Sequence, residues 1–330
     1  MKKILQVLFE HKTLTRQQAK DVMLQMAKGA YNEPEITAFI TVYLMRSITI
    51  EELQGFREGL LELCIPVHLN GYHAIDIVGT GGDGKNTFNI STLACFLVAG
   101  AGQKVAKHGN YGASSMSGAS NVMENLGYKF KNSSDALKKE VEEAGICFMH
   151  APLFHPALKT VAGIRKALGM RTFFNMLGPM VNPAQPAYQL VGVFSLEMAR
   201  IYNYLLQQSG QPFTIIHSLD GYDEISLTSD AKVITMAGEK VLTPQDLGKR
   251  VVMPQDITGG NSAEDAAKLF LKILRGDGTW AQNAVVLANA ALALQGCGAF
   301  ADYNDAYSAV VESLESGRAY AAFQKLISLQ

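Results

Sequence analysis

Apolar residues in the first 65 positions recur at helical spacing, which predicts that this part of the chain is helical. Two of these runs follow a capping-box pattern, Thr15 with Gln18 and Thr49 with Glu52, in which each residue satisfies a free backbone N–H of the other. Residues 66–73 then have the composition of a connection. The helices are therefore expected to end near residue 65.

After this connection, short β-branched runs alternate with helical ones, which is the pattern of an α/β fold. Continuous apolar runs such as AIDIV are typical of parallel strands that are buried on both faces. The last seventy residues are again mostly helical in pattern. Strands are predicted at 74–78, 104–106, 146–150, 190–193, 213–217 and 225–228, and helices at 92–99, 133–144 and 155–168.

Composition places the chain among ordinary globular proteins. Its 330 residues are enough for two structural units, with 48% hydrophobic and 18% charged residues. The formal net charge of -1 creates no global field that would attract nucleic acid or an anionic membrane, so we expect neither as a partner. Any anion-binding site must be built locally.

No segment has the pattern of an export signal or a membrane span. The first residues lack a sustained apolar stretch and a small-residue cleavage site. The apolar stretch 284–300 is interrupted by Asn289 and Gln295, which favours a buried helix. The cysteines are far apart without a C-x-x-C pair and are expected to be reduced: Cys64, Cys95, Cys147 and Cys297. We therefore expect a cytoplasmic protein.

The segment 79–92, GTGGDGKNTFNIST, lies directly after a predicted strand and before a predicted helix, a placement that presents backbone N–H groups to an anion. It almost fits two known patterns. A dinucleotide-binding G-x-G-x-x-G needs an acidic residue about 20 positions further on, yet no Asp or Glu occurs from Gly84 to Met123. A Walker A motif needs Ser or Thr after Lys85, where Asn86 stands. Neither interpretation holds.

The acid-free stretch contains Lys85, Lys104, Lys107 and His108, which predicts a positive, glycine-rich surface suited to a phosphorylated ligand. The alternative is that the glycines only allow turns and the lysines are solvated. Residues 107–121, KHGNYGASSMSGASN, add small hydroxyl residues of the kind that wrap phosphate oxygens. A flexible linker would have the same composition, but the lysine and histidine in front of it favour the phosphate loop.

Two further features carry possible chemistry. Asp220, Asp223 and Glu224 form an acidic turn at a strand end, and carboxylates are the ligands that Mg²⁺ prefers. An acidic turn by itself is more often solvated, but a chain that holds a pyrophosphate needs a cation. Arg165 lies on a helical run and could bind a carboxylate through two parallel hydrogen bonds, although composition alone favours an ordinary surface arginine.

Taken together, these segments resemble the anthranilate phosphoribosyltransferase family, within the wider group that shares its fold with pyrimidine nucleoside phosphorylases. The likeness extends from the N-terminal helices to the terminal helical region. The motifs that carry it are GTGGD at 79–83, NIST at 89–92, KHGN at 107–110, the run 155–183 with IRKALGMRTFFNMLGPMVNP, and DGYDEIS at 220–226.

The resemblance implies a small N-terminal helical domain, residues 1–65 joined by a returning segment near 165–185, and a larger α/β domain of residues 66–330. It also implies a homodimer formed through the helical domain. The reaction would transfer the phosphoribosyl group of 5-phosphoribosyl 1-pyrophosphate to the amine of anthranilate, with Mg²⁺, in tryptophan biosynthesis. No strong base is needed, because the aromatic amine is already neutral at pH 7, and no catalytic acid or base is identified among the motifs.

Site residues also follow from the resemblance. It places Mg²⁺ at Ser91, Asp223 and Glu224, and anthranilate at Gly79, Asn110 and Arg165. The residues implied around phosphoribosyl pyrophosphate are Gly79, Gly82, Asp83, Thr87, Asn89, Ile90, Ser91, Thr92, Lys107, His108, Gly109, Asn110, Tyr111, Gly112, Ala113, Ser114 and Ser115.

The chain departs from the family pattern in the loop after KHGN. Tyr111, Met116, Ala119 and Asn121 stand where the family often has Arg, Lys, Ser and Asp, so two positive charges are missing. Backbone donors can persist there. Two alternatives remain, a nucleoside phosphorylase and a noncatalytic nucleic-acid-binding relative. GTGGD with the acidic pair favours the transferase over the first, and the net charge speaks against the second.

Overall fold

The computed structural model describes residues 1–112 and 117–330, apart from the side chain of Ala157. Its contacts divide the chain into two compact units: residues 1–66 with 151–185, and residues 67–150 with 186–330. The segment that returns to the first unit begins at Ala151, earlier than the residues near 165 named from sequence. It is tied there because Ile65 donates its N–H to the carbonyl of Phe154, at 2.8 Å.

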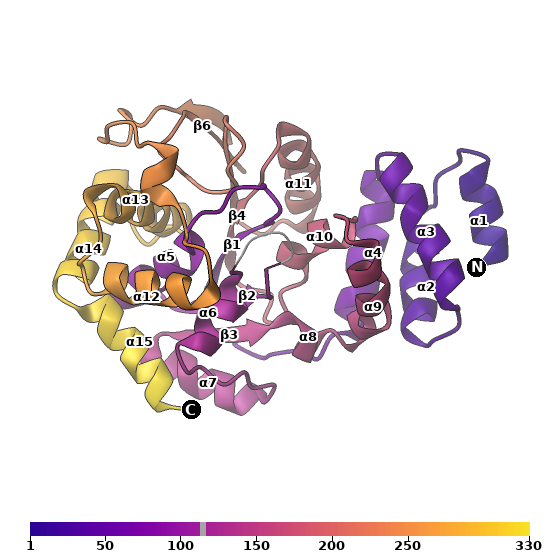
Figure 1. The fold of residues 1–330 in the computed structure, drawn as a ribbon, viewed down its shortest axis with the longest axis horizontal. Helices are drawn as coiled ribbons and strands as arrows, with labels where there is room; N and C mark the ends of the chain where they lie inside the picture. Colours follow the sequence, from indigo (N-terminus) through magenta and orange to yellow (C-terminus); the bar gives the residue numbers. More distant parts are fainter. Residues whose placement is uncertain (113–116) are drawn as a thin grey trace. The chain divides into compact units, whose positions relative to one another are not determined.

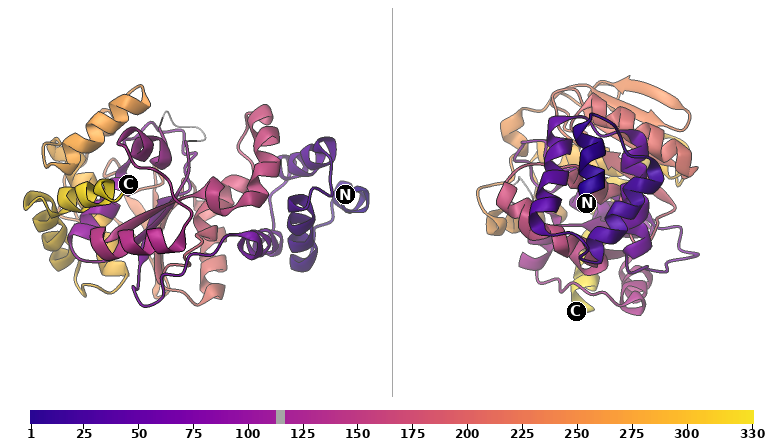
Figure 2. Two further views of the ribbon diagram at one scale, coloured as in Figure 1. Left: turned by 90° about the horizontal axis from the view of Figure 1, so that it is seen from below. Right: turned by 90° about the vertical axis from the view of Figure 1, so that its right-hand side faces the viewer.

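The first unit is a bundle of helices, of which α1 to α4 are seen in indigo in Figure 2. The two capping boxes at Thr15 and Thr49 are confirmed, and Asn32 forms a third. A Cβ on Gly55 would collide with the carbonyl of Arg16, so α2 and α4 approach closely at this glycine. The helices are α1 (Lys2–Phe9), α2 (Arg16–Ala27), α3 (Glu33–Met45), α4 (Ile50–Leu63), α8 (Ala151–Phe154), η1 (Pro156–Leu158), α9 (Lys159–Leu168), α10 (Phe174–Leu177) and η2 (Gly178–Val181).

A fully buried glutamate lies at the centre of this unit. Glu52 Oε1 accepts hydrogen bonds from the N–H of Leu14 (2.9 Å) and the hydroxyl of Tyr43 (3.1 Å). Arg46 binds both carboxylate oxygens, at 2.5 and 2.9 Å, and Thr49 donates its N–H and its hydroxyl to Oε2, each at 3.0 Å. One side chain therefore joins α3, α4 and the start of α2.

The second unit contains a sheet with the order β3-β2-β1-β4-β5-β6-β7, seven strands in the described part of the chain. In this order β3, β2, β1, β4 and β5 are parallel to one another, and β6 and β7 add an antiparallel edge. The strands are β1 (Ile75–Gly79), β2 (Val105–Gly109), β3 (Ile146–His150), β4 (Tyr188–Gly192), β5 (Phe213–Ser218), β6 (Ala231–Thr235) and β7 (Gly238–Leu242).

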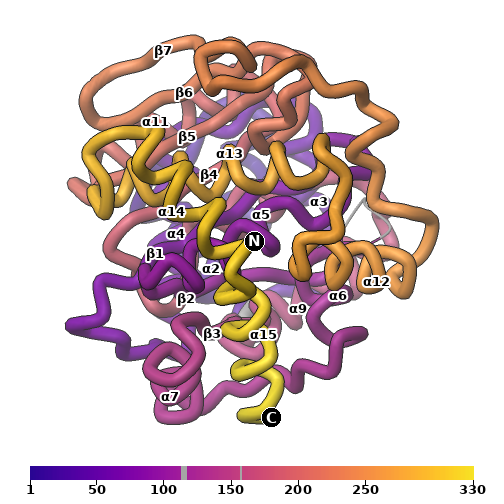
Figure 3. The backbone as a smooth tube through the Cα atoms, turned by 90° about the vertical axis from the view of Figure 1, so that its left-hand side faces the viewer, coloured from indigo at the N-terminus to yellow at the C-terminus, as the bar shows by residue number. Residues whose placement is uncertain are grey.

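Helices cover both faces of this sheet. In Figure 1, α5, α13 and α14 lie on one face and α11 on the other, and Figure 3 shows α13, α14 and α15 in orange and yellow across the first of these faces. The helices of this unit are α5 (Ile90–Gly100), α6 (Ala119–Asn125), α7 (Ser134–Ala144), α11 (Leu196–Ser209), η3 (Pro254–Ile257), α12 (Ala263–Leu274), α13 (Trp280–Gly296), α14 (Tyr303–Glu315) and α15 (Arg318–Ser328). Among described residues, no helix is long and apolar enough to cross a membrane.

Most predicted elements lie within one or two residues of the observed ones, but the strand predicted at 225–228 is wrong. Apolar and polar residues alternate in this segment and residues 225–227 are buried, yet the segment joins no ladder. The Asn289 side chain on α13 bonds both the N–H (3.0 Å) and the carbonyl (2.9 Å) of Ile225, and Leu227 has φ +59°. An amide side chain from a distant helix thus replaces the strand partner. The antiparallel strands follow instead as β6 and β7. The predicted helix at 155–168 also begins late, as η1 followed by α9.

Candidate active site

The loops that follow β1, β2 and β5 meet at the carboxyl end of the parallel strands. Gly79 ends β1 and Gly192 ends β4, and the two are paired in register. A Cβ on Gly79 would collide with the carboxylate of Asp223, and one on Gly192 with its backbone carbonyl. Both strand ends must therefore be glycine for the acidic loop after β5 to lie across them. Gly192 was not singled out from sequence, although it is the one glycine within the strand predicted at 190–193.

Hydrogen bonds tie the acidic pair to the glycine-rich loop. The N–H of Gly81 donates to Asp223 Oδ2 at 2.7 Å. Ser91, in the first turn of α5, donates its N–H (3.1 Å) and its hydroxyl (2.8 Å) to Glu224 Oε1. Ser91, Asp223 and Glu224, expected together from sequence, thus lie in one cluster. Asp220 is separate, because Thr228 and Ser229 donate their hydroxyls to it at 2.5 and 2.8 Å.

Electrostatics make this cluster unfavourable without a cation. Burial, and then the neighbouring carboxylate of Asp83, raise the pKa of Asp223 above its ordinary value. Burial and the charge of Asp223 likewise raise the pKa of Glu224. In residues 1–112 and 117–330, no three His, Cys, Asp or Glu side chains form a ready-made metal cluster. A cation here would need the Ser91 hydroxyl, water and ligand oxygens to complete its shell.

The glycine-rich loop runs from β1 to the N-terminus of α5. Gly81, Gly82 and Gly84 all have positive φ, so the loop depends on glycine. Asp83 accepts a hydrogen bond from the N–H of Lys85 at 2.9 Å. The remaining predicted residues of this loop continue into the helix: Thr87 forms a bridge with Thr258, Asn89 precedes α5 and donates to the carbonyl of Ser117, and Ile90 and Thr92 are buried in the first turn.

The prediction that the basic side chains form a positive surface is wrong. Lys107 is only 2% exposed, and its Nζ donates to the carbonyl of Ile77 at 2.7 Å. His108 is equally buried in β2. Lys104 precedes β2 and so lies at the opposite end of the strand from Gly109, while Lys85 Nζ lies 4.6 Å from the centre of the Tyr222 ring. Because the sheet is covered on both faces, side chains of β2 become core whatever their charge.

The side chain of Asn121 joins the two ends of the loop that follows β2. Asn121 Oδ1 accepts from the N–H groups of both Gly112 and Gly118, each at 3.0 Å. Asn110 precedes Gly112 and accepts, through its own side chain, from the N–H of Tyr111 at 2.8 Å. The Tyr111 ring packs against His150, with 4.7 Å between centroids. The predicted residues Ala113, Ser114 and Ser115, and the departure at Met116, lie outside the described residues.

Arg165 belongs to the first unit. Its guanidinium lies 5.4 Å from the centre of the Phe174 ring, and its Nη2 donates to Asn175 Oδ1 at the long distance of 3.5 Å. Burial lowers the pKa of Arg165. Within the described ranges no carboxylate pairs with it. A half-buried guanidinium of this kind is suited to an anionic ligand.

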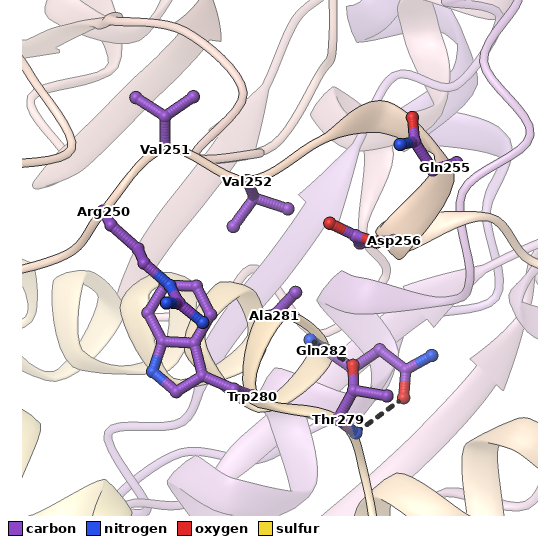
Figure 4. Close-up of a pocket in the computed structure, with 9 residues that line it drawn as sticks. All are labelled: Arg250, Val251, Val252, Gln255, Asp256, Thr279, Trp280, Ala281 and Gln282. Atoms are coloured by element: carbon purple, nitrogen blue, oxygen red, sulfur yellow. Dashed lines mark hydrogen bonds between the residues drawn. The ribbon is translucent and has the colours of Figure 1, made fainter.

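A separate hollow of about 630 Å³ lies in the second unit between Arg250 and Gln282, with Arg250 stacked 4.1 Å from the centre of the Trp280 ring (Figure 4). None of the residues predicted for the site lines it. The residues expected from sequence to form the site therefore lie outside this hollow.

Comparison with known proteins defines the class. Residues 2–64 match the helical bundle domain of a glycosyl transferase family, and residues 71–320 match its a/b domain. The helical unit and the glycine and acidic loops at the sheet edge are thus those of a two-part glycosyl transferase.

Relatives narrow this further. The chain is 56% identical to an anthranilate phosphoribosyltransferase of Cytophaga hutchinsonii, over 99% of this chain and 100% of that one. The anthranilate phosphoribosyltransferase structure of Thermus thermophilus matches with TM-score 0.91 and 30% identity, over 98% of each chain. The enzyme of Saccharomyces cerevisiae in complex with PRPP and Mg matches with TM-score 0.90 and 26% identity, over 98% of this chain and 96% of that one. The chain belongs to the anthranilate phosphoribosyltransferase family and is an enzyme.

Proposed function

We propose that this enzyme transfers the phosphoribosyl group of 5-phosphoribosyl 1-pyrophosphate to the amine of anthranilate, giving N-(5-phosphoribosyl)anthranilate and pyrophosphate. The observation that carries the proposal is the cluster of Ser91, Asp223 and Glu224 against the glycine-rich loop at the carboxyl end of β1, β4 and β5. As a step of tryptophan biosynthesis, we place the reaction in the cytoplasm.

The donor is proposed to bind along the two loops that follow β1 and β2. Two buried hydroxyls there, of Thr80 and Ser117, have no hydrogen-bond partner among the described residues, so donors are available for a ligand. The residues assigned to the donor are Gly79, Gly82, Asp83, Thr87, Asn89, Ile90, Ser91, Thr92 and the segment Lys107 to Ser115. Lys107 and His108 are included because of the resemblance, although their side chains are buried.

Mg²⁺ is proposed at Ser91, Asp223 and Glu224, whose oxygens fit a hard cation. Bound there, it would neutralise charge that develops on the leaving pyrophosphate. The chain itself would contribute position: N–H groups of the glycine loop that are not bonded to the acidic pair could donate to the same charge. The amine needs no base, so holding it in line with the ribose C1 supplies much of the rate, up to roughly 7 to 11 kcal/mol in well-oriented cases.

A direct assay tests this function. Loss of anthranilate fluorescence is expected only when the protein, phosphoribosyl pyrophosphate and Mg²⁺ are all present, and EDTA should abolish it. Full turnover after exhaustive chelation would remove the metal from the proposal. Phosphorolysis of thymidine or uridine under the same conditions, without anthranilate consumption, would favour the nucleoside phosphorylase.

Anthranilate is proposed to contact Gly79, Asn110 and Arg165, with Arg165 binding its carboxylate. Arg165→Ala should raise the KM for anthranilate about 10- to 100-fold, since a hydrogen bond to a charged group contributes about 1.5 to 3 kcal/mol. Arg165→Lys keeps the charge but loses the planar fork, so a partial defect is expected.

Steady-state kinetics with each substrate varied in turn measure this. The control is Lys166→Ala, an exposed neighbour on α9 that should behave as wild type. The KM for phosphoribosyl pyrophosphate should stay nearly constant in all three variants. Unchanged anthranilate kinetics in Arg165→Ala would leave the acceptor carboxylate with a different partner.

We also propose that the two compact units are the two domains and that the enzyme is a homodimer through the helical one. Phe9 on α1 and Met45 on α3 are 62% and 85% exposed, on helices that pack together, and Leu44 beside them is 38% exposed. Such apolar exposure is typical of a covered surface.

Met45→Glu should therefore shift the protein from dimer to monomer at micromolar concentration, because a charge would be buried in an apolar contact. Light scattering after size exclusion measures the mass. Met236→Glu, at a similarly apolar exposed position in the β6–β7 turn of the other unit, should leave the dimer intact. A monomeric wild type, or a dimeric Met45→Glu, would contradict this assignment.

A further inference from the structure

Asn86, the residue that excludes a Walker motif, ties the glycine-rich loop to a distant segment. Its side-chain Nδ2 donates to the carbonyl of Gly260 at 2.7 Å. Its own carbonyl accepts from the N–H of Gly259, also at 2.7 Å. Asn86, an exposed residue of the loop, thus both donates a hydrogen bond to the segment just before α12 and accepts one from it.

The two segments continue side by side beyond this pair. Thr87 forms an antiparallel bridge with Thr258, and the N–H of Phe88 donates to the carbonyl of Ile257 at 3.3 Å. Phe88 and Ile257 are buried, which fixes this end of the contact in the core. A Cβ on Gly259 would lie 2.5 Å from the carbonyl oxygen of Thr87, so only glycine lets the segments approach this closely.

We propose that Asn86 is a positioning residue for the phosphoribosyl donor, acting through this contact and not by touching the substrate. The inference rests on the proposed function. Gly81, Gly82 and Gly84 make the preceding loop conformationally free, and ordering such a loop on binding opposes affinity. Anchoring residues 86–88 fixes Thr87 and the start of α5, and hence the neighbouring donor-binding groups, before the donor arrives.

Asn86→Ala removes the Nδ2 donor and should raise the KM for phosphoribosyl pyrophosphate about fivefold, which corresponds to the roughly 1 kcal/mol of a typical hydrogen bond. The KM for anthranilate and kcat should stay within about twofold, and the melting temperature should hold because Asn86 is exposed. Asn86→Asp should be worse, since it sets a carboxylate oxygen against the Gly260 carbonyl. The control is Asn304→Ala, an exposed asparagine on α14.

Gly259→Ala disrupts the same contact from the other side without changing the sequence of the loop. It should raise the same KM, and the double variant with Asn86→Ala should show less than the sum of the two effects, because both disrupt one contact. A wild-type KM in Asn86→Ala, equal increases for both substrates, or additive effects would overturn the inference while the proposed function stood. A wild type without donor-dependent turnover would remove both.

Discussion

Replacing Asp223 with Asn together with Glu224 with Gln will lower kcat by on the order of 10³-fold while the chain keeps its fold. The substituted amides retain an oxygen that can accept from the N–H groups of Gly81 and Ser91, so the hydrogen bonds of the cluster persist. What they lose is charge, and with it the ability to hold a cation. Because burial and mutual repulsion make the two carboxylates unfavourable, the melting temperature without ligands should stay constant or rise.

Turnover measured over a Mg²⁺ titration, together with thermal unfolding, checks this result. Asp220→Asn is the matched control, since it lies in the same loop but binds Thr228 and Ser229. It should keep nearly full turnover and an unchanged Mg²⁺ requirement. A large fall in melting temperature in the double variant, with the same Mg²⁺ dependence as wild type, would show that the pair is structural.

Glu52→Gln will destabilise the helical unit by about 3 to 5 kcal/mol, the range for removing one partner of a buried ion pair. Its amide group can accept through only one oxygen, so some of the donors from Leu14, Tyr43, Arg46 and Thr49 are left without an acceptor in the interior. Burial alone would raise the pKa of Glu52, but the hydrogen bonds from Arg46, Leu14 and Thr49 outweigh it and hold the pKa below its ordinary value.

The sign of the pH dependence follows from that lowered pKa. Glu52 contributes stability above its unfolded pKa of about 4.3, and the contribution is lost as pH falls through the folded value. Urea unfolding at neutral pH and at a pH well below about 4 should show the difference between wild type and Glu52→Gln shrinking on acidification. Glu62→Gln, on the same helix but paired with Lys20 at the surface, should cost less than about 1 kcal/mol. Equal losses in the two variants would contradict the role of burial.

The sequence by itself determined the features that a few neighbouring residues encode. The capping boxes at Thr15 and Thr49, the glycine-rich turn between β1 and α5, and the acidic turn after β5 all follow from local hydrogen bonding and periodicity. The family resemblance was carried by the order of five motifs along the chain: GTGGD, NIST, KHGN, the run 155–183 and DGYDEIS.

Tertiary structure decided which side chains are buried and which loops touch, because partners far apart in sequence set both. Lys107 is core since helices cover both faces of its strand, and 225–228 is not a strand since Asn289 takes its hydrogen bonds. Asp223 reaches the glycine loop only because Gly79 and Gly192 leave room for it. Burial and close approach depend on side chains that pack from elsewhere, and no local pattern contains them.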